Sequence, residues 1–133
     1  MPELIDLPLS LVRDLAELTG SAHIWSLGIG PAGEACVLID SPAPYFSATL
    51  IIATADSAQR SVLRPVDDVW QYVQPLPAGG ALLARSWRRG KDNGALYGPD
   101  GTRTATFPLG EAIEDVQTVA SGRIWVSYFD ETA

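Results

Sequence analysis

The chain has 133 residues, 47% hydrophobic and 19% charged, which is enough apolar material for one packed domain, and nothing in this composition suggests disorder. Its formal net charge of −7 makes non-specific binding to DNA, RNA or an anionic membrane unfavourable. The only cysteine, Cys36, excludes an intrachain disulfide and lies in an apolar run typical of a buried, inert thiol. With no leader-like N-terminus and no membrane-length apolar span, we expect a cytoplasmic protein.

The first twenty residues form an N-terminal extension with two possible structures. Residues 11–18 carry apolar side chains at helical spacing, which predicts a short helical turn that Ser10 could cap and Gly20 could end. Residues 4–9 could instead form an edge or closing strand, because Pro8 is tolerated only at a sheet edge. An extended segment followed by a short helix accommodates both patterns.

A repeat begins after this extension. An eleven-residue pattern occurs without gaps at 27–37, 73–83 and 116–126, with an aliphatic first residue and a glycine at the seventh position. Gly33, Gly79 and Gly122 at that position indicate a hairpin turn with positive φ, followed by an apolar strand. Residues 54–60 match 98–104 in the same way, and Asp100-Gly101 is a strong hairpin signal.

The repeat unit therefore has four strands and a period of about 45 residues, within the range of propeller blades. We expect strands near 23–29, 34–40, 47–54 and 59–64 in the first unit, and near 69–75, 80–87, 94–98 and 103–108 in the second. A final hairpin is expected at 113–119 and 123–129. The predicted fold is all-β, a partial β-propeller of four-stranded antiparallel blades. We expect residues 1–133 to form one domain, with blade one at 21–65, blade two at 66–109 and a half blade at 110–133.

Residues 114–117 (Glu-Asp-Val-Gln) and 122–130 (Gly-Arg-Ile-Trp-Val-Ser-Tyr-Phe-Asp) resemble the blade pattern of uncharacterised bacterial β-propeller proteins. The resemblance extends from about residue 20 to residue 130 and implies a fold, but fold alone does not imply function. Such propellers are usually longer. Two and a half blades leave open sheet edges and an uncovered apolar face. We therefore expect a homo-oligomer or a completing partner chain, with a truncated propeller as a third possibility.

The candidate ligand-binding residues lie near one edge of the predicted blades. The loop from Trp87 to Asn93 combines an aromatic ring with cations, which can stack on a sugar or bind an acidic ligand, although a polar surface loop looks the same. The acidic pairs at 67–68 and 114–115 both precede an inner strand. Their carboxylates could bind a metal, or could simply follow from the repeat. The candidates are Asp68, Trp87, Arg88, Arg89, Glu114 and Asp115.

The sequence predicts no catalytic residue, metal site or cofactor. His23 is the only histidine, no G-x-S-x-G nucleophile motif is present, and Pro31 argues against a nucleotide site in the glycine-rich turn at 28–33. We expect Trp25, Trp70 and Trp125 to fill the space between blades. The favoured function is a non-enzymatic binding or interaction module that self-associates to complete the propeller. The alternatives are a metal-dependent hydrolase of the propeller lactonase type and an oligomeric sugar-binding propeller.

Overall fold

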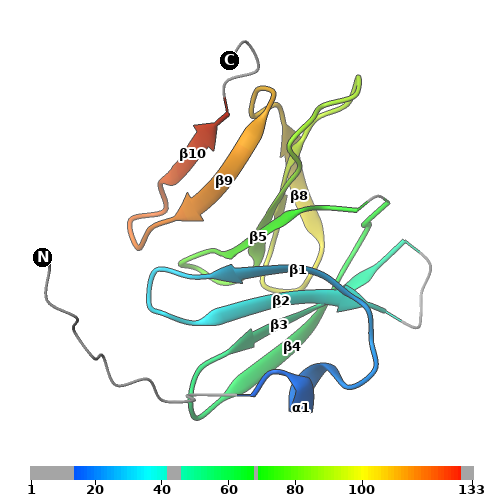
Figure 1. The fold of residues 1–133 in the computed structure, drawn as a ribbon, viewed down its shortest axis with the longest axis vertical. Helices are drawn as coiled ribbons and strands as arrows, with labels where there is room; N and C mark the ends of the chain where they lie inside the picture. Colours follow the sequence, from blue (N-terminus) through cyan, green and yellow to red (C-terminus); the bar gives the residue numbers. More distant parts are fainter. Residues whose placement is uncertain (1–13, 42–45, 68, 130–133) are drawn as a thin grey trace, which may run out of the picture.

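The computed structural model describes residues 14–41, 46–67 and 69–129 (Figure 1). Within these residues it is a stack of antiparallel sheets with one short helix, α1 (Ala16–Thr19). The prediction of an all-β fold is confirmed. No helix of the described part of the chain is long and apolar enough to cross a membrane.

Each sheet takes its strands in sequence order. The first sheet contains β1 (Ile24–Ile29), β2 (Ala35–Asp40), β3 (Ala48–Ala53) and β4 (Ala58–Leu63). The second contains β5 (Tyr72–Pro75), β6 (Ala81–Ala84), β7 (Gly94–Tyr97) and β8 (Arg103–Phe107). A hairpin of β9 (Ile113–Thr118) and β10 (Ile124–Tyr128) forms the third. Every predicted strand is present in the described residues.

The largest differences from the predicted boundaries lie at the start of β5 and at the end of β6. β6 ends at Ala84 rather than near 87, and β5 begins at Tyr72 rather than near 69. Beyond the end of β6, Arg85 donates its backbone N–H to the carbonyl of Asn93, and Arg89 takes a left-handed φ of 51°. β6 therefore ends one residue before Arg85 and three residues before Trp87.

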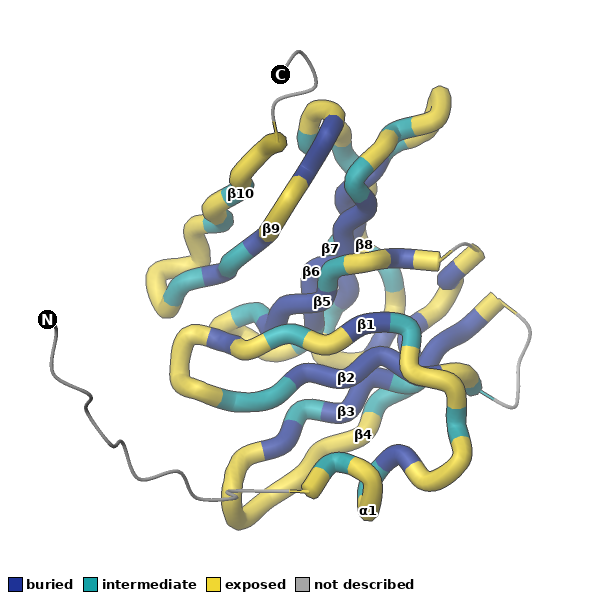
Figure 2. Tube along the Cα trace, viewed as in Figure 1, coloured by how far each residue is buried: buried dark blue, intermediate teal, exposed yellow. Residues whose placement is uncertain are grey.

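The two four-stranded sheets pack face to face around the main core. Trp70 and Tyr97 are buried there, and Trp25 packs against the same cluster. The Tyr97 hydroxyl donates to the carbonyl of Pro65 at 2.5 Å, which ties the second sheet to the connection that follows β4. Figure 2 shows the buried residues concentrated along β2, β3, β6 and β7. The second sheet and the β9–β10 hairpin share a smaller cluster that contains Leu82, Ala84, Ile113 and Val116.

The stack is covered at one end and exposed at the other. Leu15, Leu18 and Ala22 of the helical segment pack on the outer face of the first sheet, against Val37, Ile39 and Ile51. The expected turn before Gly20 is confirmed as α1, whereas Ser10 and residues 4–9 lie outside the described residues. At the other end Trp125 is 63% exposed, so the expectation that it fills a space between sheets is wrong within this chain. Trp25 and Trp70 do pack between sheets.

The first strands of the three sheets, β1, β5 and β9, contact one another in series. Gln74 on β5 joins them, since its Nε2 donates to the carbonyl of Ile29 at 3.1 Å and its Oε1 accepts from Gln117 Nε2 at 2.9 Å. Gln74 and Gln117 occupy the same repeat position, where the first unit has Gly28. A Cβ at Gly28 would lie 2.2 Å from the carbonyl oxygen of Val73. The glycine therefore lets β5 approach β1 closely.

Candidate functional site

Three connections meet at the edge of the sheets next to the loop that follows β6. Ser86, just after β6, donates its N–H to Gln71 Oε1 at 2.8 Å, and Gln71 lies just before β5. Arg88 donates its backbone N–H to Glu111 Oε2 at 2.9 Å, and Glu111 lies just before β9. We call this edge the rim. Its loops are held together by side-chain to backbone hydrogen bonds.

Asn93 anchors the base of the rim. It is fully buried, and its Nδ2 donates to the carbonyls of Arg85 at 3.0 Å and Gly110 at 2.7 Å. Its Oδ1 accepts the N–H of Leu109 at 2.7 Å. The amide group thus bonds both ends of the β6–β7 connection and the chain entering β9. The three hydrogen bonds offset the free-energy cost of burying this amide group, and they fix the conformation of the loop.

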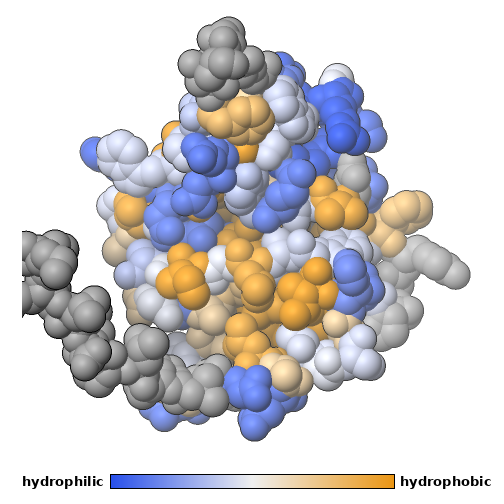
Figure 3. Space-filling model, viewed as in Figure 1, coloured by the Kyte–Doolittle hydropathy of each residue, from blue (hydrophilic) through white to orange (hydrophobic). Residues whose placement is uncertain are grey.

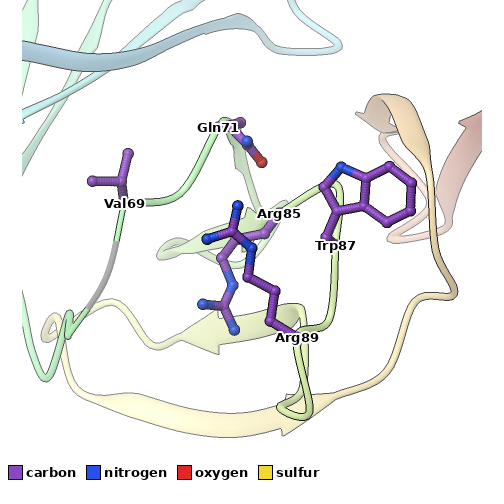
Figure 4. Close-up of a pocket in the computed structure, with 5 residues that line it drawn as sticks. All are labelled: Val69, Gln71, Arg85, Trp87 and Arg89. Atoms are coloured by element: carbon purple, nitrogen blue, oxygen red, sulfur yellow. The ribbon is translucent and has the colours of Figure 1, made fainter.

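A pocket of about 280 Å³ opens between these loops, lined by Val69, Gln71, Arg85, Trp87 and Arg89 (Figure 4). We call it the rim pocket. In Figure 4 the guanidinium groups of Arg85 and Arg89 lie between the side chains of Val69 and Trp87. The residues come from the connection before β5 and from the loop after β6, so the pocket depends on the packing of two chain segments.

The two arginines of the rim pocket are held differently. Arg85 is buried, its Nη2 donates to the carbonyl of Asp92 at 2.7 Å, and its Cζ lies 4.5 Å from the ring centroid of Trp70. This cation–π contact fixes its orientation. Arg89 is exposed and makes no hydrogen bond or ion pair with the residues that the structure describes. One cation is thus positioned by the fold, and the other projects from the loop.

Trp87 forms the apolar wall of the rim pocket. Its indole is 37% exposed and meets the ring of Phe129, just after β10, edge to face at a centroid distance of 5.6 Å. Trp87 and Arg89 also border a neighbouring hollow with Glu111. The contact with Phe129 means that the C-terminal hairpin supports the indole. Edge-to-face pairs of this kind restrain a ring while leaving its other face available.

Of the residues predicted as ligand-binding, Trp87 and Arg89 line the rim pocket. Arg88 is half-buried and does not line it. Glu114 and Asp115 lie within β9, as the strand expected at 113–119 implied, and not in a loop before it. Asp115 borders a different hollow along the inner strands, near which Figure 3 shows apolar side chains gathered over β1. Asp68 lies outside the described residues.

Sequence reasoning missed Val69, Gln71 and Arg85 in the rim pocket, and Glu111 beside it. The repeat contained a signal for Glu111, because segments that precede the inner strands share one edge with the loop between the second and third strands, whereas the strand expected at 69–75 included Gln71. Arg85 gave no such signal, since the predicted strand at 80–87 included it. Its role depends on where β6 ends.

The rim concentrates positive charge in a chain whose net charge is −7, with Arg85, Arg88, Arg89 and Lys91 on one connection. Within the described residues, no group of three or more His, Cys, Asp or Glu side chains could hold a metal ion. Cys36 is far less acidic than a reactive thiol, because burial, and secondarily the charge of Glu34, raises its pKa to about 12. The expectation of a buried cysteine is confirmed.

No family model matches the chain, and neither a curated protein nor a solved structure is similar to it at a significant level. The site is therefore interpreted from its own geometry. The resemblance to bacterial β-propeller proteins stays a prediction.

Proposed function

We propose that this protein is a non-enzymatic binding module of partial β-propeller architecture, and that its rim pocket binds a small ligand carrying a negative charge. Two features support the architecture. The four-stranded sheets take their strands in simple sequence order, and the first strand of each sheet lies beside the first strand of the next. Propeller blades have the same strand order, with their first strands around a central axis.

The observation that carries the binding role is the indole of Trp87 beside the guanidinium groups of Arg85 and Arg89. A flat or apolar part of a ligand can stack on the indole, and a carboxylate or phosphate can pair with the exposed Arg89. The described lining residues include no carboxylate, histidine, hydroxyl or thiol. The chemistry of the pocket therefore favours binding over acid–base or nucleophilic catalysis.

The metal-dependent hydrolase alternative has no specific observation in its favour, because Glu114 and Asp115 project from β9 without a described third ligand. The sugar-binding alternative shares Trp87 with our proposal but does not use the cations. We also propose that the protein self-associates as a homo-oligomer, because apolar side chains of β10 are exposed.

Titration calorimetry with inorganic phosphate, benzoate, glucuronate and glucose tests the binding proposal. We expect at least one of the three anions to bind and glucose not to bind. Arg89→Gln should weaken that binding roughly tenfold to a hundredfold, since a hydrogen bond to a charged group contributes about 1.5–3 kcal/mol. The matched control is Lys91→Gln, which removes one charge from the same loop without touching the pocket lining.

Three results would contradict the proposal. Equal binding of glucose and glucuronate would favour a neutral sugar site. An unchanged affinity in Arg89→Gln would place the anion elsewhere. Failure of all three anions to bind would remove the rim pocket as an anion site.

A further inference from the structure

The strand β10 has fewer neighbours than the strands it repeats. In each four-stranded sheet the second strand lies between two others, with β2 between β1 and β3, and β6 between β5 and β7. Among the described residues, β10 occupies the equivalent place in the third unit but pairs only with β9. The backbone N–H and C=O groups along its outer edge are therefore not paired with any described strand.

The sequence of β10 is that of an interior strand. From Ile124 to Phe129 it carries no charge, although exposed edge strands usually carry charges or prolines that prevent pairing with other chains. Ile124 and Val126 pack against the second sheet, whereas Trp125 is 63% exposed and Tyr128 51% exposed. Figure 2 shows most of β10 as exposed. Apolar residues on both faces are typical of a strand whose sheet is covered on both faces, and among the described residues the face with Trp125 is not covered.

The hydrogen-bond pattern shows which backbone groups reach the open edge. Thr118 lies opposite Ile124, but it donates its N–H to Gln74 Oε1 at 3.2 Å, away from β10. This identifies the Thr118–Ile124 pair as a non-hydrogen-bonded pair of the antiparallel ladder. Because such pairs alternate with hydrogen-bonded ones, the N–H and C=O groups of Ile124 and Val126 point toward the open edge.

We propose that β10 of a second copy of this chain pairs antiparallel with this edge across a two-fold axis, which completes a four-stranded sheet in the order β9–β10–β10–β9. The inference deepens the self-association proposed above and is independent of ligand binding at the rim pocket. The resulting sheet has as many strands as each of the two complete sheets. A two-fold contact uses the same strand on both chains and closes after two copies.

Charge favours this orientation of a second copy. In the sequence Arg123 precedes the uncharged segment, and Asp130 and Glu131 follow it. Antiparallel pairing brings the basic end of one segment toward the acidic end of the other, whereas parallel pairing would bring like charges together. The edge itself is uncharged, so little of the net charge of −7 is forced into the contact.

The covered end of the stack distinguishes this dimer from a head-to-tail ring. In a ring, the hairpin of one chain would pack on the outer face of the first sheet of the next chain. The residues Leu15, Leu18 and Ala22 already cover that face. The two-fold dimer uses only the exposed end of each chain and leaves α1 in place.

Light scattering during size-exclusion chromatography, over a range of concentrations, gives the mass of the full chain. We expect twice 14.2 kDa at high concentration. Trp125→Lys should raise the dimer dissociation constant roughly tenfold or more, because a lysine at an edge strand opposes pairing. Ser121→Lys adds the same charge in the turn of the same hairpin and should leave the dissociation constant unchanged. Circular dichroism must show that both variants fold.

Amide hydrogen exchange separates edge pairing from other contacts. The N–H groups of Ile124 and Val126 should exchange slowly in the dimer and quickly in monomeric Trp125→Lys. A monomer at every concentration would overturn both this inference and the proposed self-association. A mass larger than that of a dimer, or a dimer in which these two amides exchange quickly, would overturn the β10 pairing but would still support self-association. Anion binding at the rim pocket is measured separately and does not enter this result.

Discussion

Gln74 offers a direct test of how the three sheets are joined, because its amide group contacts all of them. The side chain is 4% exposed. Its Nε2 donates to the carbonyl of Ile29, and its Oε1 accepts from Gln117 Nε2 and from the N–H and hydroxyl of Thr118. Gln74→Met keeps the length and approximate volume of the side chain, and it removes these hydrogen bonds without creating a cavity.

The expected loss of stability follows from the partners that remain. The carbonyl of Ile29 still accepts from Gln117 Nε2 at 3.2 Å, and the hydroxyl of Thr118 still donates to the carbonyl of Pro75 at 2.8 Å. The buried N–H of Thr118 points away from β10 and keeps no described partner. An unsatisfied buried donor costs about 1–3 kcal/mol, and we expect Gln74→Met to lower the free energy of unfolding by that amount.

Urea denaturation followed by far-UV circular dichroism measures this change. Gln59→Met is the matched control, because Gln59 is exposed on β4 and surface substitutions usually change stability by less than about 0.5 kcal/mol. If Gln74→Met is as stable as Gln59→Met, the amide network does not stabilise the junction of the inner strands. A loss well above 3 kcal/mol would indicate that the methionine also disturbs the packing of β5 against β1.

Two further predictions concern buried protons and tight turns. Burial raises the pKa of Cys36 from 9.0 to about 12 and that of Tyr97 from 10.0 to about 12, so the unfolded chain loses these protons first. The free energy of unfolding should therefore be unaffected by these groups below about pH 9 and should fall as the pH rises toward 12. Urea midpoints measured across this pH range should fall less steeply in Cys36→Val than in the unchanged protein. An equal fall in both proteins would contradict the raised pKa of Cys36. Gly101 and Gly122 have similar φ values of 86° and 88°. A Cβ added at Gly101 would lie 2.0 Å from the carbonyl oxygen of Val62, whereas a Cβ added at Gly122 would have no atom within 4 Å. Gly122→Ala should destabilise by about 1 kcal/mol, and Gly101→Ala by about 1–3 kcal/mol more in the same assay; equal losses would show that the contact with Val62 is unimportant.

The β-strands and their turns could be predicted because they depend on nearby residues. Gly33, Gly79 and Gly122 mark three hairpins by a backbone conformation that glycine adopts without strain, and each has the expected positive φ. Alternating and continuous apolar runs on either side of these turns located the strands to within a few residues. The same local signals located the end of the helix at Gly20.

The rim pocket could be predicted only in part. Trp87 and Arg89 were identified because an aromatic residue and cations on one loop are a local pattern. Arg85 was not, because the strand expected at 80–87 included it, whereas β6 ends at Ala84 and tertiary contacts with Trp70 and the carbonyl of Asp92 hold its side chain. The convergence of Gln71 with this loop requires the second sheet to be folded, since the two segments are separated by two strands.

The sequence alone determined where this chain turns and where it forms strands, because φ preference and side-chain alternation act over a few residues. The tertiary structure alone decided which apolar faces are covered. Trp70 and Trp125 are the same residue type beside or within strands, yet Trp70 is buried between sheets and Trp125 is exposed. Burial depends on the presence of a neighbouring sheet, and the neighbour of β10 is not among the described strands of the chain.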